Sequence, residues 1–206
     1  MLKRFSLTVA GVCLAVCSYA QNEAGTWGLR PQVGISVSDF VGGESGEFKP
    51  KVGFVGGVYA DYQATDMLGL STGLVFSMQG AKYENEALYI DKFDMSYLNL
   101  PVMASVYVVP GLAVKAGVQF GYLLDSKIHY VDNNMTSSSG NYELDDDYCH
   151  SFMLSIPVGL SYEYRDFVVD ARYSFGLTKV FDGIFEDVGS RNNVFQLTVG
   201  YRIDND

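Results

Sequence analysis

The chain has 206 residues and a formal net charge of −10. This length suits a single domain, and the acidic balance excludes the basic footprint of a nucleic-acid-binding protein. Aromatic residues make up 14% of the chain, charged residues only 18%, and 22 residues are Gly. Because Tyr and Phe favour strands, this composition argues against a soluble helical protein. Repeated strand-like segments rich in Gly are typical of a transmembrane barrel.

The N-terminus has the parts of a secretory signal peptide. A basic region at Lys3 and Arg4 precedes an apolar run, and small residues end at Ala20. The apolar run is too short to span a bilayer as a permanent helix. We therefore predict a cleaved signal peptide over 1–20 and a mature barrel domain over 21–206.

An alternative for the same segment is a lipoprotein signal in which Leu14 to Cys17 forms the lipid-attachment box. Val16 is bulkier than the residue that usually precedes such a cysteine. If the signal is cleaved instead, Cys149 is the only cysteine left, and no intramolecular disulfide forms.

The mature sequence contains eight segments in which apolar and polar residues alternate with the period of two of a β-strand. The predicted strands are 27–37, 51–63, 68–82, 95–108, 112–124, 148–164, 167–178 and 194–203. In the last strand, one apolar face is formed by Phe195, Leu197, Val199, Tyr201 and Ile203. Pro101 lies on the polar face of the fourth strand, where its missing N–H predicts a bulge or a local distortion.

Connection lengths indicate the topology. The connections after the first, third, fifth and seventh strands are long, and those after the second, fourth and sixth are short. This alternation is typical of outer-membrane barrels, whose long loops face outside and whose short turns face the periplasm. We predict an all-β fold, an eight-stranded antiparallel up-and-down transmembrane β-barrel in the bacterial outer membrane.

A secreted soluble barrel or sandwich is the alternative, since alternation alone does not say which face is inside. A water-facing surface is normally rich in Lys and Glu, whereas the polar face here is mostly Gly, Ser, Thr and Gln. Aromatic residues also bracket the apolar faces, as bilayer girdles do. The periplasmic girdle is predicted at Trp27, Tyr62, Tyr162, Tyr164, Phe167 and Tyr201, and the outer one at Phe76, Tyr122, Phe152, Phe175 and Phe195.

Three segments resemble the PorT-like outer-membrane β-barrel family of Bacteroidetes-type bacteria. They are SYLNLPVMASVYV (Ser96 to Val108), the hairpin from Phe152 to Thr178 and the closing VFQLTVGYRI (Val194 to Ile203). The most specific part is Asp170-Ala171-Arg172-Tyr173 within the hairpin. The resemblance implies an outer-membrane barrel, and some members of the family serve in the assembly of a secretion system.

Charged residues on the polar face form the first candidate site. Strand parity places seven of them in the lumen, namely Arg30, Asp61, Lys115, Glu163, Asp170, Arg172 and Arg202. Since buried charges must be paired, we interpret them as a salt-bridged plug. A selective, porin-like pore lined by the same groups is the alternative, although the interior of eight strands is narrow enough for side chains to fill it.

Two other sites are weaker. Asp132, Asn134 and Glu143 match part of a calcium-loop spacing, but Ser137 stands where the loop requires Gly. A histidine-based hydrolase would need a serine and an acid positioned beside His150, and adjacent strand residues point to opposite faces. A solvated surface loop explains the first pattern, and we predict no metal, no cofactor and no enzymatic activity.

These observations predict a non-enzymatic barrel with a structural or interaction role through its surface loops. The alternatives are a small-solute channel or a transport or secretion accessory, and a membrane-embedded lipid-modifying enzyme. The expected partners are outer-membrane lipid, an unidentified extracellular or periplasmic partner, and the barrel-assembly machinery, with no nucleic acid. The last strand is the predicted insertion signal for that machinery.

Overall fold

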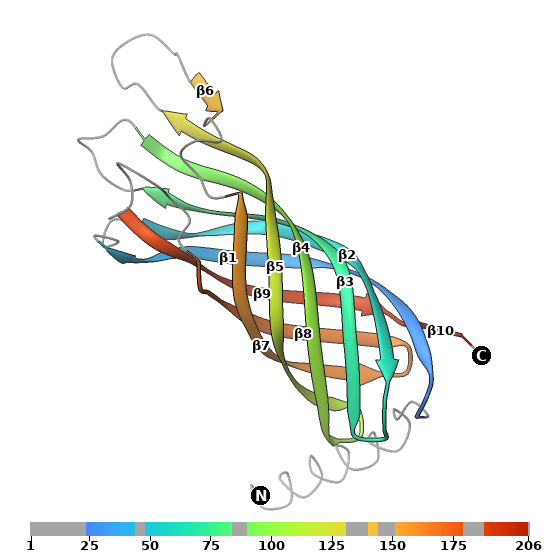
Figure 1. Ribbon diagram of the computed structural model, residues 1–206. Helices are drawn as coiled ribbons and strands as arrows, with labels where there is room; N and C mark the ends of the chain where they lie inside the picture. The colour runs from blue at the N-terminus through green and yellow to red at the C-terminus, as the bar shows by residue number, and fades with distance from the viewer. Residues whose placement is uncertain are drawn as a thin grey trace, which may run out of the picture.

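The computed structural model describes residues 24–43, 48–83, 90–130, 140–143, 151–178 and 188–205, and its regular elements there are β-strands (Figure 1). Eight strands form the wall: β1 (Trp27–Gly43), β2 (Phe48–Gln63), β3 (Leu68–Tyr83), β4 (Ile90–Val109), β5 (Leu112–Tyr130), β7 (Phe152–Tyr164), β8 (Phe167–Gly176) and β9 (Val188–Tyr201). Two short strands extend it: β6 (Gly140–Glu143) pairs with β5, and β10 (Ile203–Asp204) pairs with β1. The described residues include no helix with the length and apolarity of a membrane span.

The wall closes on itself. Each of its strands pairs antiparallel with the next one along the chain, and β9 pairs back with β1. Closure satisfies the backbone groups that an open sheet would leave at its edges, which hydrocarbon cannot do. The predicted all-β, eight-stranded antiparallel barrel is confirmed. Below, the turn end is the end of the barrel with the connections 64–67, 110–111 and 165–166, and the loop end is the opposite one.

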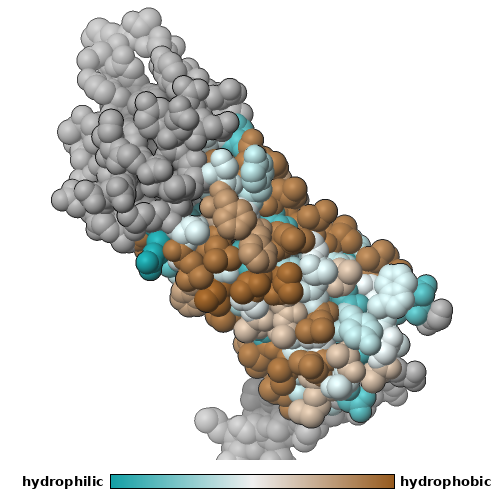
Figure 2. All heavy atoms as spheres, viewed as in Figure 1, coloured by the Kyte–Doolittle hydropathy of each residue, from teal (hydrophilic) through white to brown (hydrophobic). Residues whose placement is uncertain are grey.

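The inner and outer faces differ in polarity as the period-two pattern predicts. Along β3, for example, Leu74 on the outer face is 59% exposed, whereas Ser77 on the inner face is fully buried. Figure 2 shows apolar side chains covering the middle of the visible face of the barrel. Exposed apolar surface of this extent is typical of a protein surrounded by lipid.

Glycines on the inner face allow neighbouring strands to come close together. A Cβ atom added to Gly34 would lie 2.0 Å from the carbonyl oxygen of Leu197, and one added to Gly117 would lie 2.1 Å from that of Val102. Because these contacts are with backbone, no side-chain movement relieves them. The Gly-rich inner face that the sequence shows is therefore a requirement of the tight wall.

The closing seam is interrupted near the turn end. β9 ends at Tyr201, and the backbone N–H of Arg202 donates to the carbonyl of Asp166 at 2.6 Å. On the β1 side of this interruption stands Pro31, which has no N–H to donate. The last strand was predicted as continuous over 194–203, and it is instead β9 followed by the separate β10.

Several predicted strand boundaries are wrong, mostly because paired strands extend beyond the apolar pattern. The segment 39–50 was expected to be a loop, yet β1 runs to Gly43 and β2 begins at Phe48. The connection 44–47 is consequently no longer than the turn 64–67. The backbone of a segment outside the bilayer can still pair as a hairpin, whatever the polarity of its side chains. Alternation of apolar and polar residues therefore marks only the part of each strand that lipid surrounds.

The same extension occurs around the third and fifth strands. β4 begins at Ile90 rather than at the predicted residue 95, and β5 continues to Tyr130 rather than ending at 124. The expected irregular stretch 125–147 also contains β6. Figure 1 shows β4, β5 and β6 projecting at the loop end. β9 also begins early, at Val188 rather than at 194, whereas β8 ends at Gly176, before the predicted 178. β7 begins at Phe152, and residues 148–150 of the predicted strand lie outside the described part of the chain.

Pro101 produces a local distortion without a bulge. The register of β3 with β4 is unchanged across it, but the pairing omits Gly73 and Leu74 opposite Leu100 and Pro101. On its other side, Pro101 lies opposite Gln119 of β5. The missing N–H of Pro101 therefore interrupts the pairing of β4 with β3 but not its pairing with β5.

The predicted aromatic girdles lie on the outer face. At the turn end, Trp27 lies opposite Tyr62, and Phe167 lies opposite Tyr201 with ring centroids 5.3 Å apart. Nearer the loop end, Phe76 is half-buried, and the exposed rings are Tyr122, Phe152, Phe175 and Phe195. Aromatic rings at both ends of an apolar band are characteristic of transmembrane barrels.

Candidate functional site in the lumen

The structure places all seven predicted lumen charges on the inner face. They are Arg30 on β1, Asp61 on β2, Lys115 on β5, Glu163 on β7, Asp170 and Arg172 on β8, and Arg202 between β9 and β10. Six are at most 9% exposed, and the side chain of Asp61 is 13% exposed. Arg172 stands midway along β8, and the other six stand nearer the turn end of their strands, so most of the charges gather in one half of the barrel.

Arg30 and Asp61 form a bidentate ion pair between neighbouring strands. The Nε of Arg30 donates to Oδ2 of Asp61 at 2.6 Å, and Nη2 donates to Oδ1 at 3.0 Å. The remaining Nη1 donates to the side-chain oxygen of Gln32 at 2.8 Å. This fork geometry fixes the guanidinium in one orientation.

A second group bridges strands that are not neighbours. The Nζ of Lys115 on β5 lies 2.8 Å from Oδ2 of Asp170 on β8, with β7 between the two strands. The Nε of Arg172 lies 3.3 Å from the other oxygen of Asp170. All three side chains are at most 4% exposed, so Asp170 is a buried carboxylate held between two cations.

Tyr59 completes this group from the other side of the lumen. Nη1 of Arg172 donates to its hydroxyl oxygen. The guanidinium carbons of Arg30 and Arg172 lie 4.8 Å and 5.2 Å from the centre of its ring, within cation–π range. A Cβ atom at Gly73 would lie 3.1 Å from Cγ of Tyr59, so this glycine leaves room for the ring. We call Tyr59, Lys115, Asp170 and Arg172 the crossbar.

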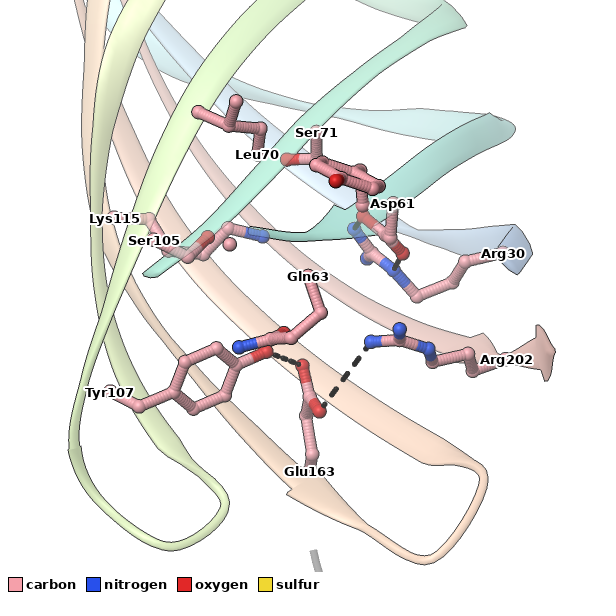
Figure 3. A pocket seen from close by; sticks show the side chains of 12 residues that line it. Arg30, Asp61, Gln63, Leu70, Ser71, Ser105, Tyr107, Lys115, Glu163 and Arg202 are labelled. Atoms are coloured by element: carbon pink, nitrogen blue, oxygen red, sulfur yellow. Dashed lines mark hydrogen bonds and ion pairs between the residues drawn. The ribbon is translucent and has the colours of Figure 1, made fainter. Parts of the chain in front are cut away.

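A smaller group lies between the crossbar and the turn end. Figure 3 shows Tyr107, Glu163 and Arg202 in sequence across the lumen. The Tyr107 hydroxyl donates to Oε1 of Glu163 at 2.7 Å, and Nη1 of Arg202 lies 3.9 Å from Oε2. The Nε of Arg202 donates to Asp204, a half-exposed residue of β10, at 2.6 Å. This group ties the closing segment of the chain to β7 and β4.

The cavity beside these groups is small. Its volume is about 10 Å³, and its lining includes Arg30, Asp61, Lys115, Glu163 and Arg202. A space of roughly this size holds about one water molecule. Together with the burial of Arg30, Lys115 and Arg202, this small volume indicates that the described side chains fill most of the lumen at this level.

The loop half of the lumen is held by amides and hydroxyls, which we call the amide layer. It consists of Ser77 and Gln79 on β3, Asn99 on β4, Gln119 on β5 and Asn192 on β9. The Asn99 side-chain nitrogen donates to Ser77 at 2.8 Å, and Gln119 donates to Asn99 at 3.2 Å. Across the lumen, Asn192 donates to Gln79 at 2.6 Å.

Sequence reasoning missed several lumen residues. Tyr59 carried the inward parity of β2 but was not assigned a role, and the large side chains of Tyr97 and Met103 fill space expected to hold small residues. Lys51 and Asp94 form an ion pair near the loop end that was also missed. Strand parity could have located Lys51 in the lumen, because Lys51 lies on the same inward face of β2 as Tyr59.

Other predicted sites fall wholly or partly outside what the structure describes. The proposed signal peptide 1–20, Asp132, Asn134 and His150 lie outside the described residues, and of Glu143 only the backbone of β6 is described, opposite Lys127. Within the described ranges, His, Cys, Asp and Glu side chains form no group of three that would hold a metal ion.

The predicted insertion-signal residues point away from the lumen. Phe195, Leu197, Val199, Tyr201 and Ile203 are between 40% and 55% exposed on the outer face. Arg202, between the last two, is 5% exposed and faces inward. The closing segment thus presents one continuous apolar stripe to the surroundings.

The sequence matches a family model described as outer membrane protein beta-barrel domain over residues 19–182. Among solved structures, Ail, the attachment invasion locus protein of Yersinia pestis, is 18% identical with a TM-score of 0.48, covering 87% of this chain and 99% of that chain. Neisserial surface protein A is 13% identical (86% and 96% covered, TM-score 0.48). OprG from Pseudomonas aeruginosa is 11% identical (90% and 99%, TM-score 0.44). No curated protein matches the sequence.

Proposed function

This chain belongs to the outer membrane protein beta-barrel domain family and lies in the bacterial outer membrane, and on that premise we propose that it acts through its surface loops as a structural or interaction protein. The barrel serves as a rigid anchor, and the connections at the loop end meet the partner. The proposal includes no catalysis. An unidentified extracellular or periplasmic partner and the surrounding lipid are its proposed contacts.

The crossbar is the observation that carries this proposal. It joins β2, β5 and β8 through buried charged contacts, and the cavity beside it has a volume of only about 10 Å³. A lumen closed in this way leaves the outer loops as the part of the chain available for specific recognition. The extended pairing of β5 with β6 gives one of these loops a fixed base.

Replacing that loop tests the proposal. Tyr130 lies opposite Gly140 at the last pair of β5 and β6, so an Asn-Gly turn in place of 131–139 keeps the hairpin intact. In a strain that lacks the gene, this variant should fail to restore whatever surface phenotype the wild-type protein restores. Gln119→Leu, a change on the inner face of β5 that lies outside the crossbar, should restore it. Equal complementation by both variants would contradict a role for this loop.

A small-solute channel or a transport or secretion accessory is the second candidate. Buried side-chain oxygens of Ser155, Ser174, Gln196 and Thr198 lack a hydrogen-bond partner among the described residues. Such groups favour water in the lumen. The PorT-like segments favour the secretion accessory, and loss of a secreted protein upon deletion of the gene would select it over the loop-binding proposal.

We further propose that the closing segment is recognised by the barrel-assembly machinery. A charge on the outer stripe must enter lipid, whereas a polar group on the inner face does not. Tyr201→Asp should therefore reduce the amount of inserted, heat-modifiable barrel much more than Arg202→Gln does. Equal loss of inserted protein in both variants would contradict the assignment of these faces.

A further inference from the structure

The outer face of the barrel contains a groove that neither the loops nor the lumen explain. It has a volume of about 430 Å³ and lies over β2, β3 and β4. Ala60 and Thr72 lie opposite each other in the groove, with Trp27 and Tyr62 nearer the turn end and Leu70 and Val102 beside them. Asp61, Ser71 and Met103 also border the groove, but they lie on the inner face of their strands and are largely buried. The surface that the groove exposes is therefore apolar apart from the threonine hydroxyl and the polar edges of the two aromatic rings.

Two local features produce this hollow. Ala60 and Thr72 are small outward-facing residues in a row where the neighbouring positions carry large side chains, including Tyr62 and Leu70. Immediately beyond Thr72, the pairing of β3 with β4 omits the residues opposite Pro101. A short side chain and an interrupted ladder at the same place leave a depression in an otherwise convex wall.

The position of the groove determines what can occupy it. It is continuous with the apolar surface of the barrel, and Trp27 and Tyr62 in its lining are 49% and 46% exposed. Interfacial Trp and Tyr mark the depth at which acyl chains meet the head groups. We propose that the groove binds one acyl chain of a phospholipid from the inner leaflet, with Trp27 and Tyr62 in contact with the chain.

Other occupants fit the groove less well. A second copy of the barrel presents a convex wall, which reaches the base of a narrow groove with single side chains only. The residues that precede the first strand include Gln21, Asn22 and Glu23, which are too polar for hydrocarbon. An acyl chain is slender, flexible and apolar, and it is the material that surrounds this surface. Its binding is independent of any partner of the outer loops.

The single tryptophan makes the groove directly testable, because Trp27 is the only Trp in the chain. The full-length protein is inserted into phosphatidylglycerol vesicles that contain a phospholipid brominated along one acyl chain, and is then extracted into detergent. Bromine quenches a neighbouring tryptophan, so a lipid retained in the groove should leave Trp27 fluorescence quenched after extraction. Native mass spectrometry of the same sample should find one bound phospholipid.

Two matched variants decide the outcome. Ala60→Phe fills the groove, and Ala116→Phe makes the same change on the outer face of β5, a strand that contributes no residue to the lining. Heat-modifiable gel mobility confirms that both are folded. We expect Ala60→Phe to lose the retained phospholipid and Ala116→Phe to keep it. Retention in both variants, or loss from both, would overturn the proposal, as would a wild-type dimer that only Ala60→Phe dissociates.

Discussion

The two halves of the lumen are closed by different chemistry. The turn half contains the crossbar and the Arg30–Asp61 pair, with cations and carboxylates in direct contact. The loop half contains the amide layer, in which neutral groups such as Asn99 and Gln119 bond to each other, and its Lys51–Asp94 ion pair is more exposed than the charges of the crossbar. In both halves side chains contact each other across the barrel. The halves differ in the group that is left unpaired when one contact is removed, which is a charge in the turn half and an amide in the loop half.

An unpaired buried charge is far more costly than an unpaired amide. Removing one partner of a buried ion pair costs about 3–5 kcal/mol, whereas a neutral hydrogen bond contributes about 1 kcal/mol. The rigid closure of the barrel therefore lies in the turn half, where the crossbar spans the lumen. The loop half, nearer the proposed binding surface, should tolerate substitution.

The largest effect is expected from Lys115→Met. This change leaves Asp170 with Arg172 as its remaining cation at 3.3 Å, and it should lower the free energy of unfolding by about 3–5 kcal/mol. Urea unfolding of the protein in vesicles measures the loss. Lys115→Met combined with Asp170→Asn should recover part of it, because the buried carboxylate that lost its closer cation is then neutral. A single variant within 1 kcal/mol of wild type, about one neutral hydrogen bond, would refute the crossbar as a stabilising closure.

Tyr59→Phe should have the next largest effect. It removes the hydroxyl that accepts from Arg172 but keeps the ring beneath both guanidinium groups. A hydrogen bond to a charged group contributes about 1.5–3 kcal/mol, and the same unfolding assay reads this loss. Tyr59→Leu, which also removes the ring, should be less stable than Tyr59→Phe. The reverse order would show that the ring contacts contribute nothing.

Gln119→Leu tests the other half of the comparison. The change removes the amide that donates to Asn99 at 3.2 Å, and it should cost about 0.5–1.5 kcal/mol. Leu keeps most of the side-chain volume, so packing changes little. If Gln119→Leu proved as destabilising as Lys115→Met, the two halves would not differ as described.

The smallest effect is expected from Arg202→Gln. Arg202 is itself buried, but its contact with Glu163 is long at 3.9 Å and its closer partner, Asp204, is half-exposed at the turn end. Because solvent screens the Asp204 pair, we expect its loss to cost about 0–1 kcal/mol, as for a surface ion pair. Unfolding at low and high salt should show the difference from wild type shrinking as salt rises. A loss that is large and independent of salt would place Arg202 within the rigid closure.

Much of the fold was predictable because lipid on one side and a packed lumen on the other enforce alternation along every strand. The seven lumen charges were located by parity alone, and all of them face inward. The strand ends were not predictable from the same pattern. Residues such as Gly43 and Tyr130 lie in strands that continue beyond the apolar pattern, where no alternation marks the pairing.

The partners within the lumen were beyond the sequence. That Lys115 meets Asp170 depends on the stagger of β5 against β8, which are not adjacent, and on the path of a long side chain. Tyr59 was missed for a related reason, because an inward tyrosine has no distinguishing pattern until the residue opposite it is known. Parity identifies which residues face the lumen but does not pair them.

Conductance across planar bilayers tests the central claim most directly. A lumen closed by the crossbar predicts no stable open state for the wild-type barrel, and discrete current steps once Tyr59 and Arg172 are both replaced by Ala. Folding of both proteins is checked by heat-modifiable mobility. A stable, ion-selective current through the wild-type barrel would contradict closure of the lumen and favour the channel function.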